Sequence, residues 1–178
     1  PTLFRSAVDE GCDLDAAALP PFRTPFTFEP PRPLLSRTTS PALPSVQSIT
    51  PYRGCVPGCV YCYARPSHAF LGLSPGLDFE TKLFAKPDAA ALLERELSKT
   101  NYRPRVINLG SNTDPYQPIE RRHRITRQIL EVLSAFNHPV SIVTKSNLIL
   151  RDLDILAPMA AKGLAAAAVS VTTLKNRL

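Results

Sequence analysis

The chain has 178 residues, of which 44% are hydrophobic and 20% charged, and it carries a formal net charge of +6. This length suffices for one globular domain with its own core, and no apolar run is long enough to cross a bilayer, so we expect no membrane-spanning segment. The charge is compatible with an anionic partner such as nucleic acid, but the excess is too small and too dispersed to identify one. Four cysteines, three of them crowded together, do not form a disulfide framework, which favours a reducing cytoplasmic location.

Residues 1–47 differ from the rest of the chain. Prolines cluster between positions 20 and 44, and apolar periodicity is weak. This pattern predicts an extended proline-rich arm that packs partly against the domain and has little regular structure. Cys12 lies in this arm, and we interpret it as an isolated thiol. Residues 48–178 are predicted to form the core domain.

Strands and amphipathic helices alternate from residue 48 onward. Four short apolar runs predict strands at residues 48–51, 106–109, 140–144 and 165–171. One helix is predicted after Asp88, one after the basic residues at 121–124, and one from Asp152 to near Gly163. Pro158 should kink or divide the third helix. A fourth helix is predicted to open at residues 174–178.

The order of these elements predicts a parallel sheet with right-handed crossovers, which an open doubly wound sheet and a barrel both satisfy. Polar motifs follow all four strands, and a site drawn from several consecutive strand ends is typical of barrels, whereas open sheets use one switch point. The sequence therefore favours a barrel. Because four strands cannot close one, the last strand would keep an open edge. We therefore expect the chain to be the N-terminal portion of a longer protein, with a C-terminal remainder that completes the fold.

Three cysteines fall in one short loop, with the spacing Cys55-x3-Cys59-x2-Cys62. Thiols grouped this closely in a cysteine-poor chain are metal ligands more often than packing residues. Three soft ligands without a fourth cysteine nearby suit an iron–sulfur cluster that keeps one iron free. Gly54 and Gly58 would let the backbone wrap a bulky inorganic core.

The cysteine spacing, with Tyr61 just before the last cysteine, resembles the signature of the radical S-adenosylmethionine (SAM) enzymes. The stretches 52–55 (YRGC), 58–68 (GCVYCYARPSH) and 112–120 (NTDPYQPIE) resemble the branch related to spore photoproduct lyase, which is DNA repair photolyase-like. The resemblance extends from about Arg37 to the end of the chain. It implies a partial TIM-type (β/α) barrel of the radical SAM type, truncated after the fourth strand.

The resemblance also implies a chemistry. The cysteines would hold a [4Fe–4S] cluster that reductively cleaves SAM to a 5′-deoxyadenosyl radical, and this radical would abstract hydrogen from an unidentified substrate, with damaged DNA as one candidate. The reaction would be lyase-like and would need a one-electron donor such as a flavodoxin- or ferredoxin-like protein. Photoproduct lyases use a C-terminal cysteine to return hydrogen, and no cysteine of this chain except the remote Cys12 could take that part.

Site residues carry over from the same resemblance. Tyr61 would lie along the adenine of SAM. Asn112, Thr113 and Asp114 stand where many relatives carry a glutamate for the methionine amino group. Lys145 would reach the SAM carboxylate, and Ser170 would lie near the ribose or methionine. Read alone, Asp114 before proline can be a simple turn, Lys145 an ordinary exposed lysine and Ser170 a buried hydroxyl.

Two other classes of protein remain as alternatives. A structural or nucleic-acid-binding zinc module would use Cys55, Cys59, Cys62 and His68 in Cys₃His geometry. An iron–sulfur electron carrier would need a fourth protein ligand for its cluster, which the loop lacks. The basic residues at 121–124, with Arg127, are either a solvated helix face or an anion-binding patch.

Overall fold

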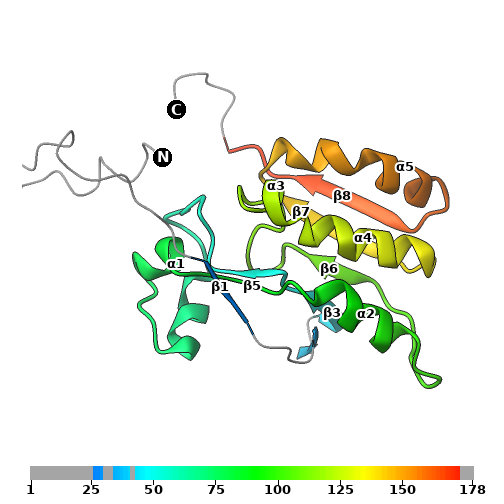
Figure 1. The fold of residues 1–178 in the computed structure, drawn as a ribbon, viewed down its shortest axis with the longest axis horizontal. Coiled ribbons are helices and arrows are strands. Elements are labelled where there is room, and N and C mark those ends of the chain that lie inside the picture. The colour runs from blue at the N-terminus through cyan, green and yellow to red at the C-terminus, as the bar shows by residue number, and fades with distance from the viewer. Residues whose placement is uncertain (1–25, 30–33, 41–42, 173–178) are drawn as a thin grey trace, which may run out of the picture.

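The computed structural model describes residues 26–29, 34–40 and 43–172. These residues form a mixed α/β fold with two sheets (Figure 1). Its strands are β1 (Phe26–Phe28), β2 (Leu35–Ser40), β3 (Leu43–Ile49), β4 (Tyr52–Arg53), β5 (Leu83–Ala85), β6 (Ile107–Leu109), β7 (Val140–Thr144) and β8 (Ala165–Val169). Its α-helices are α1 (Asp78–Thr81), α2 (Ala89–Leu97), α3 (Glu120–His123), α4 (Ile125–Ala135) and α5 (Leu153–Ala161), and 3-10 helices span Arg65–Leu71 and Asn147–Asp152.

The larger sheet has the strand order β2-β3-β6-β7-β8. Strands β3, β6, β7 and β8 run parallel in the order in which the chain visits them, while β2 pairs antiparallel with β3. The predicted parallel sheet is therefore confirmed, and β6, β7 and β8 fall where strands were expected. This sheet is open, with β2 and β8 at its two edges. The strands that the structure describes therefore do not form a closed barrel.

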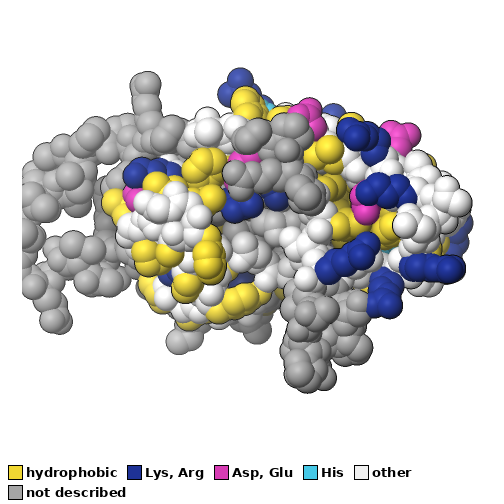
Figure 2. Space-filling view, turned by 90° about the horizontal axis from the view of Figure 1, so that it is seen from below, with side chains coloured by type: hydrophobic (Ala, Val, Ile, Leu, Met, Phe, Trp, Pro, Cys, Tyr) yellow, Lys and Arg dark blue, Asp and Glu magenta, His cyan; other side chains and the backbone are white. Residues whose placement is uncertain are grey.

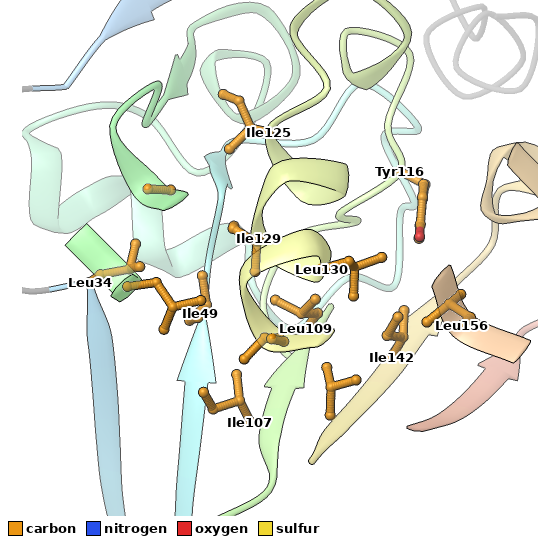
Figure 3. Packing of buried hydrophobic residues seen from close by; sticks show 14 of the residues in the cluster. Leu34, Ile49, Ile107, Leu109, Tyr116, Ile125, Ile129, Leu130, Ile142 and Leu156 are labelled. Atoms are coloured by element: carbon orange, nitrogen blue, oxygen red, sulfur yellow. The ribbon is translucent and has the colours of Figure 1, made fainter. Parts of the chain in front are cut away.

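Helices α2, α4 and α5 lie side by side over one face of this sheet (Figure 1). Their apolar faces meet the buried side chains of the strands, as Figure 3 shows for α4 over β6 and β7. Burial of each such side chain contributes about 1.5–3 kcal/mol to folding. The predicted apolar face of α4 is confirmed for most of its positions, although Phe136 at its end is 41% exposed. The labelled core residues of Figure 3 in these elements are Ile107, Leu109, Ile125, Ile129, Leu130, Ile142 and Leu156.

A second, three-stranded sheet has the order β1-β5-β4, with β1 parallel and β4 antiparallel to β5. Together with β2 and most of β3, β1 lies in the part of residues 1–47 for which little regular structure was predicted, so that prediction is wrong for the described residues. The prolines fall outside the paired positions of β1 and β2, and pairing with β5 and β3 supplies the backbone hydrogen bonds. Cys12 and the helix predicted at 174–178 lie outside the described residues.

The predicted helices differ from the structure at two points. Arg124 adopts a left-handed conformation, with φ 53°, and separates α3 from α4. Pro158 lies inside α5, and the helix continues through it rather than being divided there. Proline removes the hydrogen bond to the carbonyl four residues earlier, which here belongs to the exposed Asp154, where water can replace the lost donor.

The parallel strands bring the expected polar segments to one edge of the sheet. The cysteine loop follows β3 and the short strand β4, the segment 110–120 follows β6, Lys145 follows β7, and Ser170 follows β8. Since the carboxyl ends of parallel strands share an edge, these four segments are neighbours.

Candidate metal centre

The cysteine loop is shaped by local backbone bonds and by two glycines. Cys55 donates its N–H to the Phe79 carbonyl at 2.8 Å, and Gly58 and Cys62 close successive turns on the Cys55 and Cys59 carbonyls at 3.2 and 3.1 Å. Gly54 has φ +75°, and a Cβ there would come within 2.8 Å of the Phe79 carbonyl oxygen. This position therefore requires glycine both for its conformation and for the close approach of the backbone.

The three loop cysteines are all free thiols, with Cys55 buried and the other two half-buried. Burial raises the pKa of the Cys55 thiol to about 12, while a hydrogen bond from the Asp114 backbone N–H acts in the opposite direction. Within residues 26–29, 34–40 and 43–172, no group of three or more His, Cys, Asp or Glu side chains is arranged so that it could hold a metal ion. The three thiols share one loop but do not form such a group among the described residues.

Arg65 supports the backbone of the second half of the loop, a contact that residue spacing does not predict. Its Nε donates to the Cys59 carbonyl at 3.1 Å and its Nη2 to the Gly58 carbonyl at 3.0 Å. The same guanidinium pairs with Glu80. These charge-assisted bonds hold the Gly58 and Cys59 carbonyls against the guanidinium, so Arg65 fixes the backbone at Cys59.

The segment that follows β6 contacts the base of the cysteine loop. The Thr113 hydroxyl donates to the Tyr52 carbonyl, and the Tyr52 hydroxyl donates to the Glu120 carboxylate. Gln117 reaches the backbone on either side of Cys55. The two motifs that carry the sequence resemblance are therefore in direct contact. The contacting residues Gln117 and Glu120 were not predicted as site residues, because their partners are backbone atoms and a tyrosine far away in the sequence.

Asp114 joins the ends of β6 and β7. Its Oδ1 accepts a hydrogen bond from the Thr144 hydroxyl at 2.6 Å, and its Oδ2 accepts one from the Lys145 backbone N–H at 2.9 Å. The Ser170 N–H donates to the Thr144 carbonyl at 2.8 Å. Asp114, Lys145 and Ser170, which were all predicted as site residues, thus lie on adjacent strand ends.

The remaining predicted site residues differ in exposure. Tyr61 is 66% exposed, and the Lys145 side chain is also exposed and pairs with no carboxylate in the part of the chain described. Asn112 is half-buried, whereas Thr113 is buried. Ser170 was weighed as a buried hydroxyl, but the residue is exposed. Tyr61, Lys145 and Ser170 are therefore available to a ligand.

His68, the fourth ligand of the zinc alternative, is fully buried. Its Nε2 lies 2.9 Å from the Lys82 carbonyl, and its ring packs edge-on against Phe79 and Phe84. Its Nδ1 has no hydrogen-bond partner among the described atoms. The bond to a carbonyl requires a proton on Nε2, which leaves Nδ1 as the only nitrogen with a lone pair for a metal.

A buried ionic network lies behind the site. Glu120 and Asp152 have fully buried side chains, and Arg151 bridges them, with Nη2 at 2.7 Å from Glu120 and Nε at 2.8 Å from Asp152. Arg127 pairs with Asp152 at 3.0 Å and with Asp154 at 2.7 Å. The prediction that Arg127 belongs to a solvated or anion-binding patch is therefore wrong, because acidic side chains of the same protein neutralise it.

The surface charge is unevenly distributed. Seen from below, Lys and Arg side chains gather toward the end of the molecule that carries α2, and hydrophobic side chains gather around the end that carries α1 (Figure 2). Exposed cations on α2 and the loop after it are Arg95, Lys99, Arg103 and Arg105. In the residues that the structure describes, no helix is long and apolar enough to cross a membrane.

Several proteins are similar to this chain in amino-acid sequence. Uncharacterized proteins of Mycobacterium bovis and Mycobacterium tuberculosis are 42% identical to it over 130 residues, which is 73% of this chain and 38% of each relative. An uncharacterized protein of Methanocaldococcus jannaschii is 33% identical over 107 residues, 60% of this chain and 38% of that protein. The chain thus spans well under half the length of these relatives. No family profile and no solved structure matches it.

Proposed function

We propose that the protein is a radical SAM enzyme in which Cys55, Cys59 and Cys62 hold a [4Fe–4S] cluster. One observation carries this proposal: three free thiols lie on one glycine-shaped loop, at the sheet edge where Asp114, Lys145 and Ser170 also lie. The proposed complete fold is a TIM-type (β/α) barrel, and the order of β3, β6, β7 and β8 in the sheet is compatible with it.

The donor set suits such a cluster by its chemistry. Thiolates are the ligands that iron–sulfur clusters take, and three of them leave one iron for a small molecule. Cys55 is buried beside the Asp114 backbone N–H, a donor that would stabilise a thiolate. Cys59 and Cys62 are half-buried, and their side chains would turn toward Cys55 on loading. When bound, the cluster would supply one electron for the cleavage of SAM to methionine and a 5′-deoxyadenosyl radical.

The residues of the chain would bind and orient SAM. The exposed Lys145 ammonium would pair with its carboxylate, and Tyr61 would cover its adenine. Ser170 would contact the ribose or methionine. The Thr113 hydroxyl already donates to Tyr52 and would offer SAM only an accepting lone pair, together with Asn112 beside it. Asp114 would act by fixing Lys145, since both of its oxygens are engaged.

The zinc module remains the alternative from another class, and the structure supports it less well. His68 would have to bind through Nδ1 while buried against two phenylalanine rings. The cluster proposal needs no ligand outside the loop, whereas the zinc proposal needs the buried His68 as its fourth ligand.

Anaerobic reconstitution of the full chain with iron and sulfide tests the proposal. We expect a brown protein with the electron paramagnetic resonance signal of a reduced [4Fe–4S] cluster, and release of 5′-deoxyadenosine when SAM and dithionite are added. Alanine at Cys55, Cys59 or Cys62 should abolish cluster assembly. A colourless protein that retains stoichiometric zinc and is unaffected by SAM would instead establish the zinc module.

For the substrate we propose damaged DNA, as the sequence resemblance implies. The formal net charge of +6 supports a polyanion, whereas the exposed cations after α2 precede β6 and lie at the sheet edge opposite the cysteine loop. Contacts between cationic side chains and phosphates make affinity fall steeply with salt. Binding of a labelled duplex with and without ultraviolet damage, measured at several salt concentrations, tests this. A lack of binding at low salt would remove DNA as the substrate without affecting the cofactor chemistry. The electron donor is proposed to be a flavodoxin- or ferredoxin-like protein.

A further inference from the structure

We propose that Gln117 is the residue that positions Cys55, by holding the backbone on both sides of it before any metal binds. This role rests on the proposed function in one respect, namely that Cys55 is a metal ligand. It assigns the second sequence motif a task in the metal centre itself, in addition to contacts with SAM.

The geometry of the Gln117 carboxamide is specific. Its Nε2 donates to the Gly54 carbonyl at 3.2 Å, and its Oε1 accepts a hydrogen bond from the Val56 N–H at 3.3 Å. A carbonyl can only accept and a backbone N–H can only donate, so the orientation of the amide is fixed by its partners. Gln117 is only 1% exposed, and its bond to Gly54 is buried and protected from competition by water, while its bond to Val56 is partly buried.

The three cysteines are held unequally. The Cys55 N–H is bonded to Phe79, and Gln117 holds the residues before and after it, so the backbone at Cys55 is fixed from two directions. Arg65 holds the Cys59 carbonyl, and Cys62 is attached by a turn bond to that residue. Cys55 is also the buried thiol of the three. The structure thus presents one buried thiol with backbone bonds on both sides and two half-buried thiols.

Gln117 is itself well anchored. Its backbone N–H bonds to the Asp114 carbonyl at 3.4 Å, and its carbonyl accepts from the Glu120 N–H at 2.9 Å. Both neighbours are tied elsewhere, Asp114 to the end of β7 and Glu120 to the buried ionic network. A shift of Cys55 would therefore have to displace this whole segment.

The competing interpretation is that Gln117 merely satisfies buried polar groups. Gln47 provides the matched control, because it is a buried glutamine whose Oε1 accepts from the Tyr102 hydroxyl at 3.0 Å, in a cluster separate from the cysteine loop. Gln128, an exposed glutamine on α4, controls for the substitution on the surface. The variants are Q117L, Q117E, Q47L and Q128L.

The first measurement uses the metal-free full chain. Exchange of the Val56 amide hydrogen, followed by NMR, should be slow in the wild type and accelerate about tenfold or more in Q117L, the factor expected for the loss of one hydrogen bond. Alkylation of Cys55 should accelerate relative to Cys59 and Cys62. Q47L and Q128L should change neither the exchange rate of the Val56 amide nor the alkylation of Cys55 relative to Cys59 and Cys62. Equal effects of Q117L and Q47L on Cys55 would overturn the proposal.

The Q117E variant separates the two bonds. Its carboxylate still accepts from Val56 but cannot donate to Gly54, so Val56 should stay protected while alkylation of Cys55 rises. If Q117L does not fold, this variant carries the test, and unchanged Cys55 reactivity in Q117E would then contradict the positioning role.

The second measurement uses the iron-loaded protein. Q117L and Q117E should shift the reduction potential and the electron paramagnetic resonance signal of the cluster, whereas Q47L should not. If the wild type takes up no cluster but Q117L still accelerates the alkylation of Cys55, the proposed function fails and the positioning role stands. If the wild type loads normally and the Gln117 variants match Q47L in both measurements, the function stands and the positioning role fails.

Discussion

The Tyr52 hydroxyl donates a hydrogen bond to the carboxylate of Glu120, which lies 68 positions further along the chain. Glu120 also accepts from the Thr126 N–H at 2.9 Å and pairs with Arg151. Burial and the negative charge of Glu120 raise the pKa of Tyr52 well above its ordinary value, so the hydroxyl remains a donor. One buried carboxylate thus ties the strand that precedes the cysteine loop to the first turn of α4.

Replacement of Tyr52 by phenylalanine tests this tie. The ring would still fill its space, but the Glu120 carboxylate would lose a donor in a site that water does not reach. We expect the free energy of unfolding to fall by about 1–3 kcal/mol, measured by urea denaturation. The same substitution at Tyr61, which is 66% exposed and whose hydroxyl has no hydrogen-bond partner among the described residues, should cost less than about 0.5 kcal/mol. Equal costs at the two positions would show that the buried bond contributes nothing.

Asp152 should make the protein sensitive to acid. Burial pushes the pKa of its carboxyl up, but hydrogen bonds from Arg151 and Arg127 outweigh burial and hold the pKa below its ordinary value. As the pH falls, the Asp152 carboxyl therefore takes up a proton at a higher pH in the unfolded chain than in the folded protein. The stability that it contributes is complete above the unfolded pKa of about 3.9 and is lost as the pH falls through the folded pKa.

The D152N substitution should remove that acid dependence. At neutral pH it should lower the free energy of unfolding by about 3 kcal/mol, since Arg151 and Arg127 both lose the buried Asp152 charge, although Arg151 keeps Glu120 and Arg127 keeps Asp154. Below about pH 5 its stability should fall less steeply than that of the wild type. The exposed Asp88, whose side chain caps no backbone N–H, provides the control D88N. Parallel pH profiles for D152N and the wild type would refute the assignment.

The elements that could be predicted from the sequence differ in a physical way from those that could not. Strands β6, β7 and β8 and helices α2, α4 and α5 were predictable because apolar periodicity within each segment specifies them. Strands β4 and β5 span two and three residues, too short for periodicity, and exist because they pair with each other and with β1. Their stability comes from contacts that no local pattern encodes.

The candidate site divides in the same way. The cysteines could be found from their spacing, and Asp114, Lys145 and Ser170 from the ends of predicted strands. The backbone contacts of Arg65 and Gln117 could not be predicted, because any residue type supplies the carbonyls and amides that they bind. A polar side chain that bonds to backbone groups has no partner residue of a particular type, so the sequence does not reveal the contact.

His138 should produce a second pH dependence in a milder range. Burial lowers the pKa of its imidazole, and the ring bonds to the Tyr102 hydroxyl at 2.8 Å. In the unfolded chain the imidazole has an ordinary pKa of about 6.5, so it takes up a proton at a higher pH than in the folded protein. The stability that the neutral, buried His138 contributes is therefore complete above about pH 6.5 and is lost as the pH falls. The H138Q variant should therefore show a flatter stability profile between about pH 7 and pH 5. Y102F should lower stability without flattening the profile, and an unchanged slope in H138Q would contradict the expectation.

Lys145 should be required for SAM binding but not for the metal. Its backbone is fixed by Asp114, while its ammonium is exposed at the edge of the sheet. Alanine there should weaken SAM affinity about tenfold or more, the cost of one charge-assisted hydrogen bond, with cluster content unchanged. Binding is measured by equilibrium dialysis with labelled SAM. The control is K162A, whose ammonium bonds to Asn137 at the other end of α5, and equal affinities in the two variants would remove Lys145 from the site.

Two glycines with similar backbone angles should respond very differently to alanine. Gly110, at the end of β6, has φ +89°, and a Cβ there would lie 1.9 Å from the Val143 carbonyl oxygen of β7. Gly72 has φ +72°, but no atom lies within 4 Å of its Cβ position. G72A should cost about 1–2 kcal/mol of stability, the penalty of a left-handed conformation alone. G110A should cost more than about 4 kcal/mol, because β6 and β7 must also separate at the edge that carries the site. Thermal unfolding measures both, and similar costs would mean that β6 and β7 do not approach this closely.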